Sequence, residues 1–148
     1  MKTLTIRWQR LVNERGETCE RCAATEQAVR DAAAALRQAL HGLGIAVRLE
    51  TDMLGPAGFA EAPLESNRLW LDDIPLEQWL GASSGASPCC SACGNAHCRT
   101  LELAGQSHEA IPAELIIRAG LLAAAQLLGR PASACCEQAA PPGRPRLT

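Results

Sequence analysis

The sequence has few aromatic residues, no excess of charge of one sign and no long hydrophobic run. Its 148 residues include three tryptophans, one phenylalanine and no tyrosine. The formal net charge is -2, so the basic excess typical of a nucleic-acid-binding surface is missing. The most apolar stretch, residues 115–128, is interrupted by Arg118 and Gln126 and is too short to span a bilayer. We therefore expect neither nucleic acid nor a membrane as a partner.

The signatures of several large enzyme classes are also missing. The sequence contains no phosphate-binding loop, no dinucleotide-binding glycine pattern and no Ser-His-Asp order. The N-terminal residues carry Lys2 and Arg7 without a long apolar run, so no secretory signal is predicted. The length suits one domain with one core, and we expect a cytoplasmic protein.

Cysteine, by contrast, is abundant. The eight cysteines fall into an N-terminal CxxC pair, a dense central group and a vicinal pair near the C-terminus: Cys19 and Cys22; Cys89, Cys90, Cys93 and Cys98; Cys135 and Cys136. In a reducing cytoplasm, so many cysteines indicate metal binding or redox chemistry rather than structural disulfides. The sequence leaves the role of the C-terminal pair open.

Hydrophobic periodicity predicts an α/β domain over residues 1–128. Apolar residues alternate in the segments predicted as strands and recur at helical spacing in those predicted as helices. The expected strands are residues 3–12, 45–50, 67–72 and 100–104, with 107–110 as a hairpin partner, and the expected helices are 25–40, 75–80 and 112–128.

The order of these elements predicts a thioredoxin-like fold. A strand, a helix and a second strand form a unit whose strands are parallel. We expect a central mixed sheet of about four strands with helices on both faces. The cysteine-rich residues 82–99 are then an insertion between the third and fourth strands, and a linker of small residues at 81–87 leads into its cysteines. Residues 129–148, rich in Pro, Ala and Gly, are expected to be a disordered tail.

The sequence also resembles a known family. The resemblance is carried by motifs distributed over about residues 3–128, at residues 5–12, 18–22, 64–70, 75–81, 87–94 and 110–117. With these motifs the chain is similar to an uncharacterised family of small prokaryotic proteins known only as a domain of unknown function. The resemblance implies a thioredoxin-like fold and no established activity. Where thioredoxins place a cis-proline before the third strand, this sequence has Ser66 and Asn67.

The CxxC pair can form a disulfide or bind one metal ion. As a redox pair, Cys19 is expected to be the attacking thiolate and Cys22 the thiol that resolves the mixed disulfide. Arg21 supplies a nearby positive charge. Thr25 is the expected N-cap of the following helix, so two alanines separate the pair from the helix end, which weakens the help of the helix dipole. Two buried, inert cysteines are the alternative.

The central cysteine group predicts a metal site. Cys90 and Cys93 have the spacing of a chelating pair, and Cys98 with Cys89 or His97 would complete a tetrahedral set. Zinc is the expected metal. An iron–sulfur cluster or a soft ion such as Cu(I), Hg²⁺ or As(III) is the alternative, because thiolates are soft ligands.

The two thiol groups can also combine. In a thioredoxin-like fold the central loop could reach the CxxC, so that Cys19, Cys22, Cys90 and Cys93 form one four-cysteine site. The function predicted overall is a thiol-based redox protein, in its enzymatic form a thiol–disulfide oxidoreductase, with a separate metal-binding loop and a protein thiol as partner. The alternatives are a non-enzymatic binder of soft metals or metalloids and a structural zinc protein.

Overall fold

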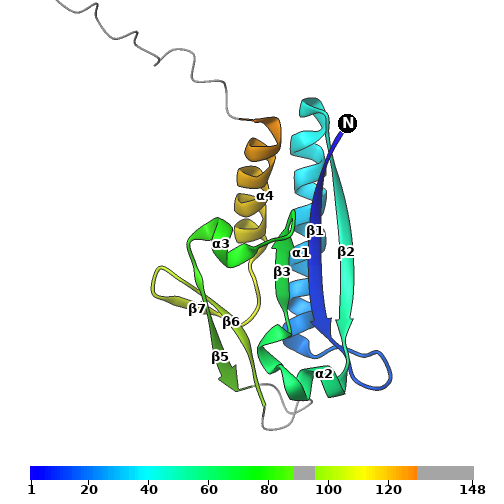
Figure 1. Cartoon of the computed structure of the whole chain (residues 1–148), viewed down its shortest axis with the longest axis vertical. Coiled ribbons are helices and arrows are strands. Elements are labelled where there is room, and N and C mark those ends of the chain that lie inside the picture. The colour runs from blue at the N-terminus through cyan, green and yellow to red at the C-terminus, as the bar shows by residue number, and fades with distance from the viewer. Residues whose placement is uncertain (89–95, 130–148) are drawn as a thin grey trace, which may run out of the picture.

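The computed structural model describes residues 1–88 and 96–129 and arranges them around two β-sheets (Figure 1). The main sheet has the order β2-β1-β3-β4, with β1 (Lys2–Leu11), β2 (Ile45–Leu54), β3 (Arg68–Leu71) and β4 (Ile74–Pro75). The second sheet has the order β5-β6-β7, with β5 (Ser83–Pro88), β6 (His97–Leu103) and β7 (Gln106–His108). The helices are α1 (Glu20–Leu40), α2 (Pro56–Glu61), α3 (Leu76–Leu80) and α4 (Ala113–Leu128), with short 3-10 helices η1 (His41–Leu43) and η2 (Pro63–Glu65).

The main sheet is mixed. β1 pairs in parallel with β2 along its whole length, and the connection between them contains α1. β3 pairs antiparallel with β1, and β4 pairs antiparallel with β3. The predicted α/β class and the four-stranded mixed sheet are therefore confirmed, and the strand directions are those of the thioredoxin-like layout.

The core lies between the main sheet and its two long helices. Leu4, Ile6 and Trp8 alternate along β1 and are fully or almost fully buried in one cluster with Leu36 of α1 and Ile116 of α4. Helices α1 and α4 lie side by side (Figure 1). Alternate residues of a strand point to opposite faces, so this single apolar stripe on β1 selects the face that the long helices cover.

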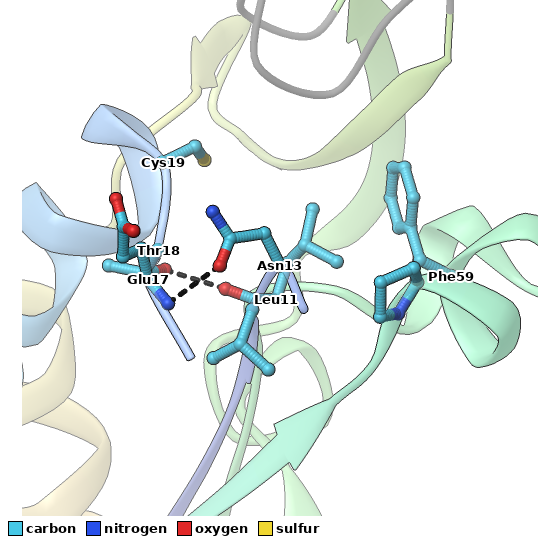
Figure 2. Close-up of a pocket in the computed structure, with 8 residues that line it drawn as sticks. Leu11, Asn13, Glu17, Thr18, Cys19 and Phe59 are labelled. Carbon is cyan, nitrogen blue, oxygen red and sulfur yellow. Dashed lines mark hydrogen bonds between the residues drawn. The ribbon is translucent and has the colours of Figure 1, made fainter. Parts of the chain in front are cut away.

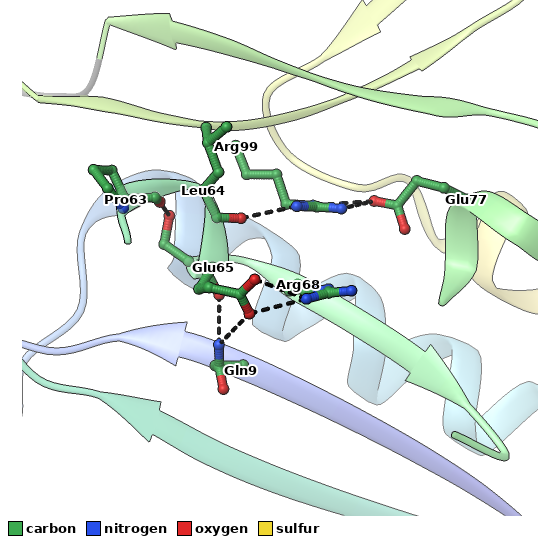
Figure 3. A network of polar contacts seen from close by, with 8 residues as sticks. Gln9, Pro63, Leu64, Glu65, Arg68, Glu77 and Arg99 are labelled. Carbon is green, nitrogen blue, oxygen red and sulfur yellow. Dashed lines mark hydrogen bonds and ion pairs between the residues drawn. The ribbon is translucent and has the colours of Figure 1, made fainter. Parts of the chain in front are cut away.

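Polar contacts hold the other face of β1. The amide of Gln9 donates to the Glu65 carbonyl of η2 at 2.7 Å, and Arg68 forms an ion pair with the Glu65 carboxylate at 2.7 Å (Figure 3). Arg7 and Arg68 both stack on the Trp70 ring, with guanidinium carbons 4.2 and 4.8 Å from its centre. Cationic stacking shields an aromatic side chain that β3 presents on this face.

The cysteine-rich segment does not occupy the place that the sequence predicted. The fourth strand of the main sheet is the short β4, so the predicted strand 100–104 belongs instead to the second sheet, as part of β6. The predicted linker of small residues is strand β5, which pairs with β6 from Ser83 opposite Glu102 to Pro88 opposite His97. The segment is thus the connection of a β5–β6 hairpin and not an insertion within the main sheet. The predicted hairpin of residues 100–104 with 107–110 is confirmed by β6 and β7.

The predicted tail and part of the hairpin connection lie outside the described residues. These are residues 130–148 and 89–95. Within the described part of the chain, no helix combines the length and hydrophobicity needed to cross a membrane.

Candidate functional site

The CxxC pair begins helix α1. Cys19 is the N-cap, with φ -76° and ψ 167°, and its carbonyl accepts the Ala23 amide at 2.8 Å. Cys22 is the third residue of the helix. The expectation that Thr25 caps this helix is wrong: Thr25 is fully buried inside α1, and its hydroxyl accepts the Ile111 amide at 3.2 Å. The two alanines are therefore helical, and the helix dipole acts directly at the cysteine pair.

The two cysteines differ in their surroundings. Both are thiols, with Cys19 8% and Cys22 2% exposed. A hydrogen bond to Cys19 and burial raise the pKa of the Cys22 thiol far above its usual range, and weaker hydrogen bonds to Leu11 and Thr18 act in the opposite direction. The raised pKa favours the protonated form of Cys22, which is hydrogen-bonded to Cys19.

A pocket of about 270 Å³ opens beside Cys19 (Figure 2). Its apolar wall is made by Leu11, Val12, Pro56 and Phe59, and its polar wall by Asn13, Glu17 and Thr18. Cys19 belongs to the lining of this pocket, whereas Cys22 does not. A molecule in the pocket meets the sulfur of the first cysteine.

The loop between β1 and α1 fixes the polar wall. The side-chain oxygen of Asn13 accepts the backbone amides of Arg15 and Glu17, each at 2.9 Å. The Thr18 hydroxyl donates to the Leu11 carbonyl at 2.7 Å. With its oxygen used in this way, the Asn13 amide places its nitrogen on the side of Cys19, as Figure 2 shows.

Arg21 connects the CxxC pair to the β5–β6 hairpin. Its guanidinium donates to the Pro88 carbonyl at 3.1 Å and to the Arg99 carbonyl at 3.2 Å. Pro88 directly precedes the first of the four central cysteines, and Arg99 directly follows Cys98. The start of α1 therefore lies against both strand ends from which the cysteine-rich connection emerges.

The structure places one of the four predicted metal ligands. Cys98 lies in β6, is 4% exposed and belongs to the same buried cluster as Cys19 and Cys22. Its sulfur is in a disulfide bond, so it would have to be reduced before it could bind a metal as a thiolate. His97, the alternative ligand, is exposed. The other predicted ligands and the C-terminal pair lie outside the described residues: Cys89, Cys90 and Cys93; Cys135 and Cys136. Across residues 1–88 and 96–129, no three His, Cys, Asp or Glu side chains are grouped to hold a metal ion.

Asn67, the residue directly before β3, has a structural role. It adopts a left-handed backbone conformation with φ 54° and is 5% exposed. Its side-chain oxygen accepts the Trp8 indole N–H at 3.0 Å, and its amide nitrogen donates to the Glu109 carbonyl at 3.3 Å. The oxygen and the nitrogen of the Asn67 amide thus both form hydrogen bonds within the protein.

Sequence reasoning missed most of the pocket. Asn13 follows the first predicted strand and Phe59 lies between the predicted strands 45–50 and 67–72, and neither position carries a local signal of a binding site. Their roles depend on the meeting of the β1–α1 loop with α2, which is a tertiary contact.

Comparison with known proteins places the chain in a family. The model of one family matches residues 4–120, which is most of the chain. The chain belongs to DUF2703, a domain of unknown function. This DUF2703 protein is 39% identical over 113 residues to an uncharacterized protein of Archaeoglobus fulgidus, a match that covers 76% of this chain and 82% of the archaeal protein. The predicted membership of an uncharacterised prokaryotic family is confirmed. No solved structure matches the chain, so the thioredoxin-like assignment rests on strand order and on the position of the CxxC pair.

Proposed function

We propose that this DUF2703 protein is a cytoplasmic thiol–disulfide oxidoreductase that acts through Cys19 and Cys22. The observation that carries the proposal is the division between the two sulfurs. Cys19 caps α1 and lines the pocket, while Cys22 is buried behind it and holds its proton. A helix N-terminus favours a thiolate, which is the reactive form of cysteine.

The reaction follows from these positions. The Cys19 thiolate attacks one sulfur of a substrate disulfide, and the other sulfur leaves as a thiolate that takes up a proton. Cys22 then loses its proton and attacks the Cys19 sulfur, which breaks the mixed disulfide and releases the second substrate thiol. The substrate gains two electrons, and Cys19 and Cys22 end as a disulfide.

A redox titration with single-cysteine variants tests the proposal. We expect the wild-type pair to convert reversibly to a disulfide at a potential of roughly -200 to -300 mV, close to the cytosolic range. Cys19→Ser should abolish disulfide reduction. Cys22→Ser should trap a mixed disulfide on Cys19. Cys93→Ser, outside the CxxC, is the control and should retain activity. A pair that shows no reversible couple contradicts the proposal.

For the hairpin connection we propose metal binding by Cys89, Cys90, Cys93 and Cys98, with zinc as the first choice. Thiolates suit zinc and softer ions, and the spacing of Cys90 and Cys93 supports the binding of one ion by both.

The Arg21 contacts favour a second candidate function, the binding of a soft metal or metalloid by both thiol groups together. These contacts bring the ends of the hairpin connection to the CxxC pair. Elemental analysis of anaerobically purified wild type and Cys19→Ser distinguishes a separate metal site in the hairpin connection from a joint site with the CxxC pair. A metal content that depends on Cys19 supports the joint site, and one that does not supports the separate loop.

A further inference from the structure

The pocket beside Cys19 indicates which disulfides the protein reduces. We propose that it is a substrate subsite for a small aliphatic disulfide that is neutral or positively charged. This inference rests on the proposed redox function of Cys19 and Cys22, and it goes further by naming the class of substrate and the residues that select it.

The size and walls of the pocket favour a small molecule over a folded protein. Cys19 is only 8% exposed and lines a pocket of about 270 Å³, slightly below the usual range of ligand sites, about 300 to 1,000 Å³. The apolar wall of Leu11, Val12, Pro56 and Phe59 suits an aliphatic arm. A disulfide held within a folded protein would have to enter this space together with its flanking backbone.

Asn13 supplies a directed hydrogen-bond donor. Two backbone amides occupy its side-chain oxygen, at 2.9 Å each, so its N–H groups face the Cys19 side of the pocket (Figure 2). These N–H groups can donate to a hydroxyl or carbonyl oxygen of the bound arm. They can also donate to the sulfur that becomes negative as the disulfide breaks.

Glu17 supplies the selection by charge. It is the only charged side chain among the residues that line this pocket in the described part of the chain. Its carboxylate attracts a cationic arm and repels an anionic one. Because Glu17 is exposed to water, we expect each effect to be moderate, about threefold to tenfold in rate.

Atoms and electrons balance in one turnover of this reaction. The thiolate of Cys19 forms a bond to one sulfur of R–S–S–R and expels the other as R–S⁻, which is protonated. Cys22 then gives up its proton and attacks the Cys19 sulfur, and the second R–S⁻ leaves and takes up a proton. Two molecules of R–SH and one Cys19–Cys22 disulfide result, so the reduced protein itself supplies both electrons.

The test measures single-turnover rates of the reduced full-length protein with matched disulfides. The probes are cystamine, 2-hydroxyethyl disulfide and 3,3′-dithiodipropionate, which are similar in size and cationic, neutral and anionic, with insulin as a protein disulfide. The ratio of the cystamine rate to the dithiodipropionate rate should fall about tenfold or more in Glu17→Gln. When this ratio is compared between wild type and a variant, the intrinsic reactivities of the two probes cancel. Glu14→Gln is the control, because Glu14 lies on the same loop and lines only a neighbouring hollow; its ratio should match wild type.

Asn13→Asp provides a second, isosteric test. The carboxylate can still accept the Arg15 and Glu17 amides, so the loop should keep its shape, but the donor facing Cys19 becomes an anion. We expect the rate with 2-hydroxyethyl disulfide to fall about tenfold and its pH profile to move to higher pH, because a nearby negative charge disfavours the Cys19 thiolate. An unmoved pH profile would show that the Asn13 side chain lies too far from the Cys19 sulfur to act on it.

The failures of the two proposals can be told apart. If wild type reduces none of the probes, insulin included, the redox function fails. If wild type reduces disulfides but Glu17→Gln leaves the rate ratio unchanged and Asn13→Asp leaves the pH profile unchanged, the subsite proposal is overturned and the redox function stands. The same conclusion follows if insulin reacts faster than all three small probes.

Discussion

Cys19 and Cys22 have different surroundings because of their places on one helix. Cys19 is the N-cap, where the chain has not yet entered the helix, so its sulfur reaches the pocket formed by the preceding loop. Cys22 lies on the first turn, on the side that faces the core, and is 2% exposed. The short CxxC spacing thus places one thiol at a surface pocket and the other behind it, which suits an attacking and a resolving cysteine.

The raised pKa of Cys22 predicts a loss of stability at alkaline pH. In the unfolded chain the thiol ionises near its ordinary pKa of 9.0, whereas in the folded protein it keeps its proton. The stabilisation that results is fully present below this unfolded pKa and is lost as pH rises above it. From about pH 9 upward, we expect the free energy of unfolding of wild type to fall faster than that of Cys22→Ser, by at most about 1.4 kcal/mol per pH unit.

Urea denaturation of reduced wild type and Cys22→Ser at about pH 7, 9 and 10 measures this difference. Both proteins keep the other seven cysteines and the one lysine, Lys2, so the other alkaline titrations are largely common to them. A stability difference that stays constant across the three conditions would show that burial does not hold the proton on Cys22.

At the residue scale, the sequence showed the CxxC pair but not its setting. The CxxC motif stands out in the sequence because cysteine is a scarce residue and two at this spacing are rare. Thr25 has the right chemistry for an N-cap, yet its hydroxyl binds the distant Ile111 amide, a contact that no local pattern reveals. Asn13 looks like an ordinary turn residue, and only the meeting of its loop with α2 makes it part of a pocket.

At the element scale, a glycine lies in the contact between the two long helices. A β-carbon built on Gly120 of α4 would lie 2.4 Å from one methyl carbon of Leu36 in α1. Leu36 is fully buried, so it has little room to move away. The absence of a side chain at Gly120 is therefore what lets α4 pack against α1.

We expect Gly120→Ala to destabilise the protein although alanine is the better helix former. Overpacking against Leu36 should cost about 1 to 3 kcal/mol, which exceeds the gain of about 1 kcal/mol in helix propensity. The free energy of unfolding measured in urea would give the net change. Adding Leu36→Val should recover part of the loss by removing a methylene at the contact. Gly42→Ala is the matched control, because nothing lies within 4 Å of a β-carbon there, and it should be almost neutral.

The elements that the sequence predicted well are those with a clear apolar period. β1 and α4 show such a period, and the structure contains both. Strand β5 does not, because its residues 83–88 are serines, a glycine, an alanine and a proline without a large apolar side chain, and its hydrogen bonds come from β6. A strand of this kind is determined by its neighbour, so the sequence showed only a linker, and the hairpin that carries the cysteine-rich connection was missed.

At the scale of the whole molecule, Arg99 joins the second sheet to the helices around the main sheet. From β6 its guanidinium forms an ion pair with the Glu77 carboxylate of α3 at 2.8 Å and donates to the Leu64 carbonyl of η2, also at 2.8 Å (Figure 3). The side chains of Arg99 and Glu77 are 12% and 14% exposed. Because the carbonyl of Arg99 also accepts Arg21, one residue connects the second sheet to the CxxC helix, to α3 and to η2.

Removal of either partner of this pair should therefore affect the whole fold. Glu77→Ala leaves a mostly buried guanidinium without its counter-ion, and Arg99→Met leaves a mostly buried carboxylate. We expect each to lower the free energy of unfolding by about 2 to 4 kcal/mol, somewhat below the cost for fully buried pairs because some water reaches this one. The double variant Glu77→Leu with Arg99→Met should lose clearly less free energy of unfolding than the sum of the two single changes, since no unpaired charge remains.

Urea unfolding followed by both tryptophan fluorescence and far-ultraviolet circular dichroism gives these free energies. In wild type the two signals should change together because the two sheets unfold as one unit. Additive losses in the double variant, or a fluorescence transition separate from the dichroism transition in wild type, would show that this ion pair does not unite the two sheets.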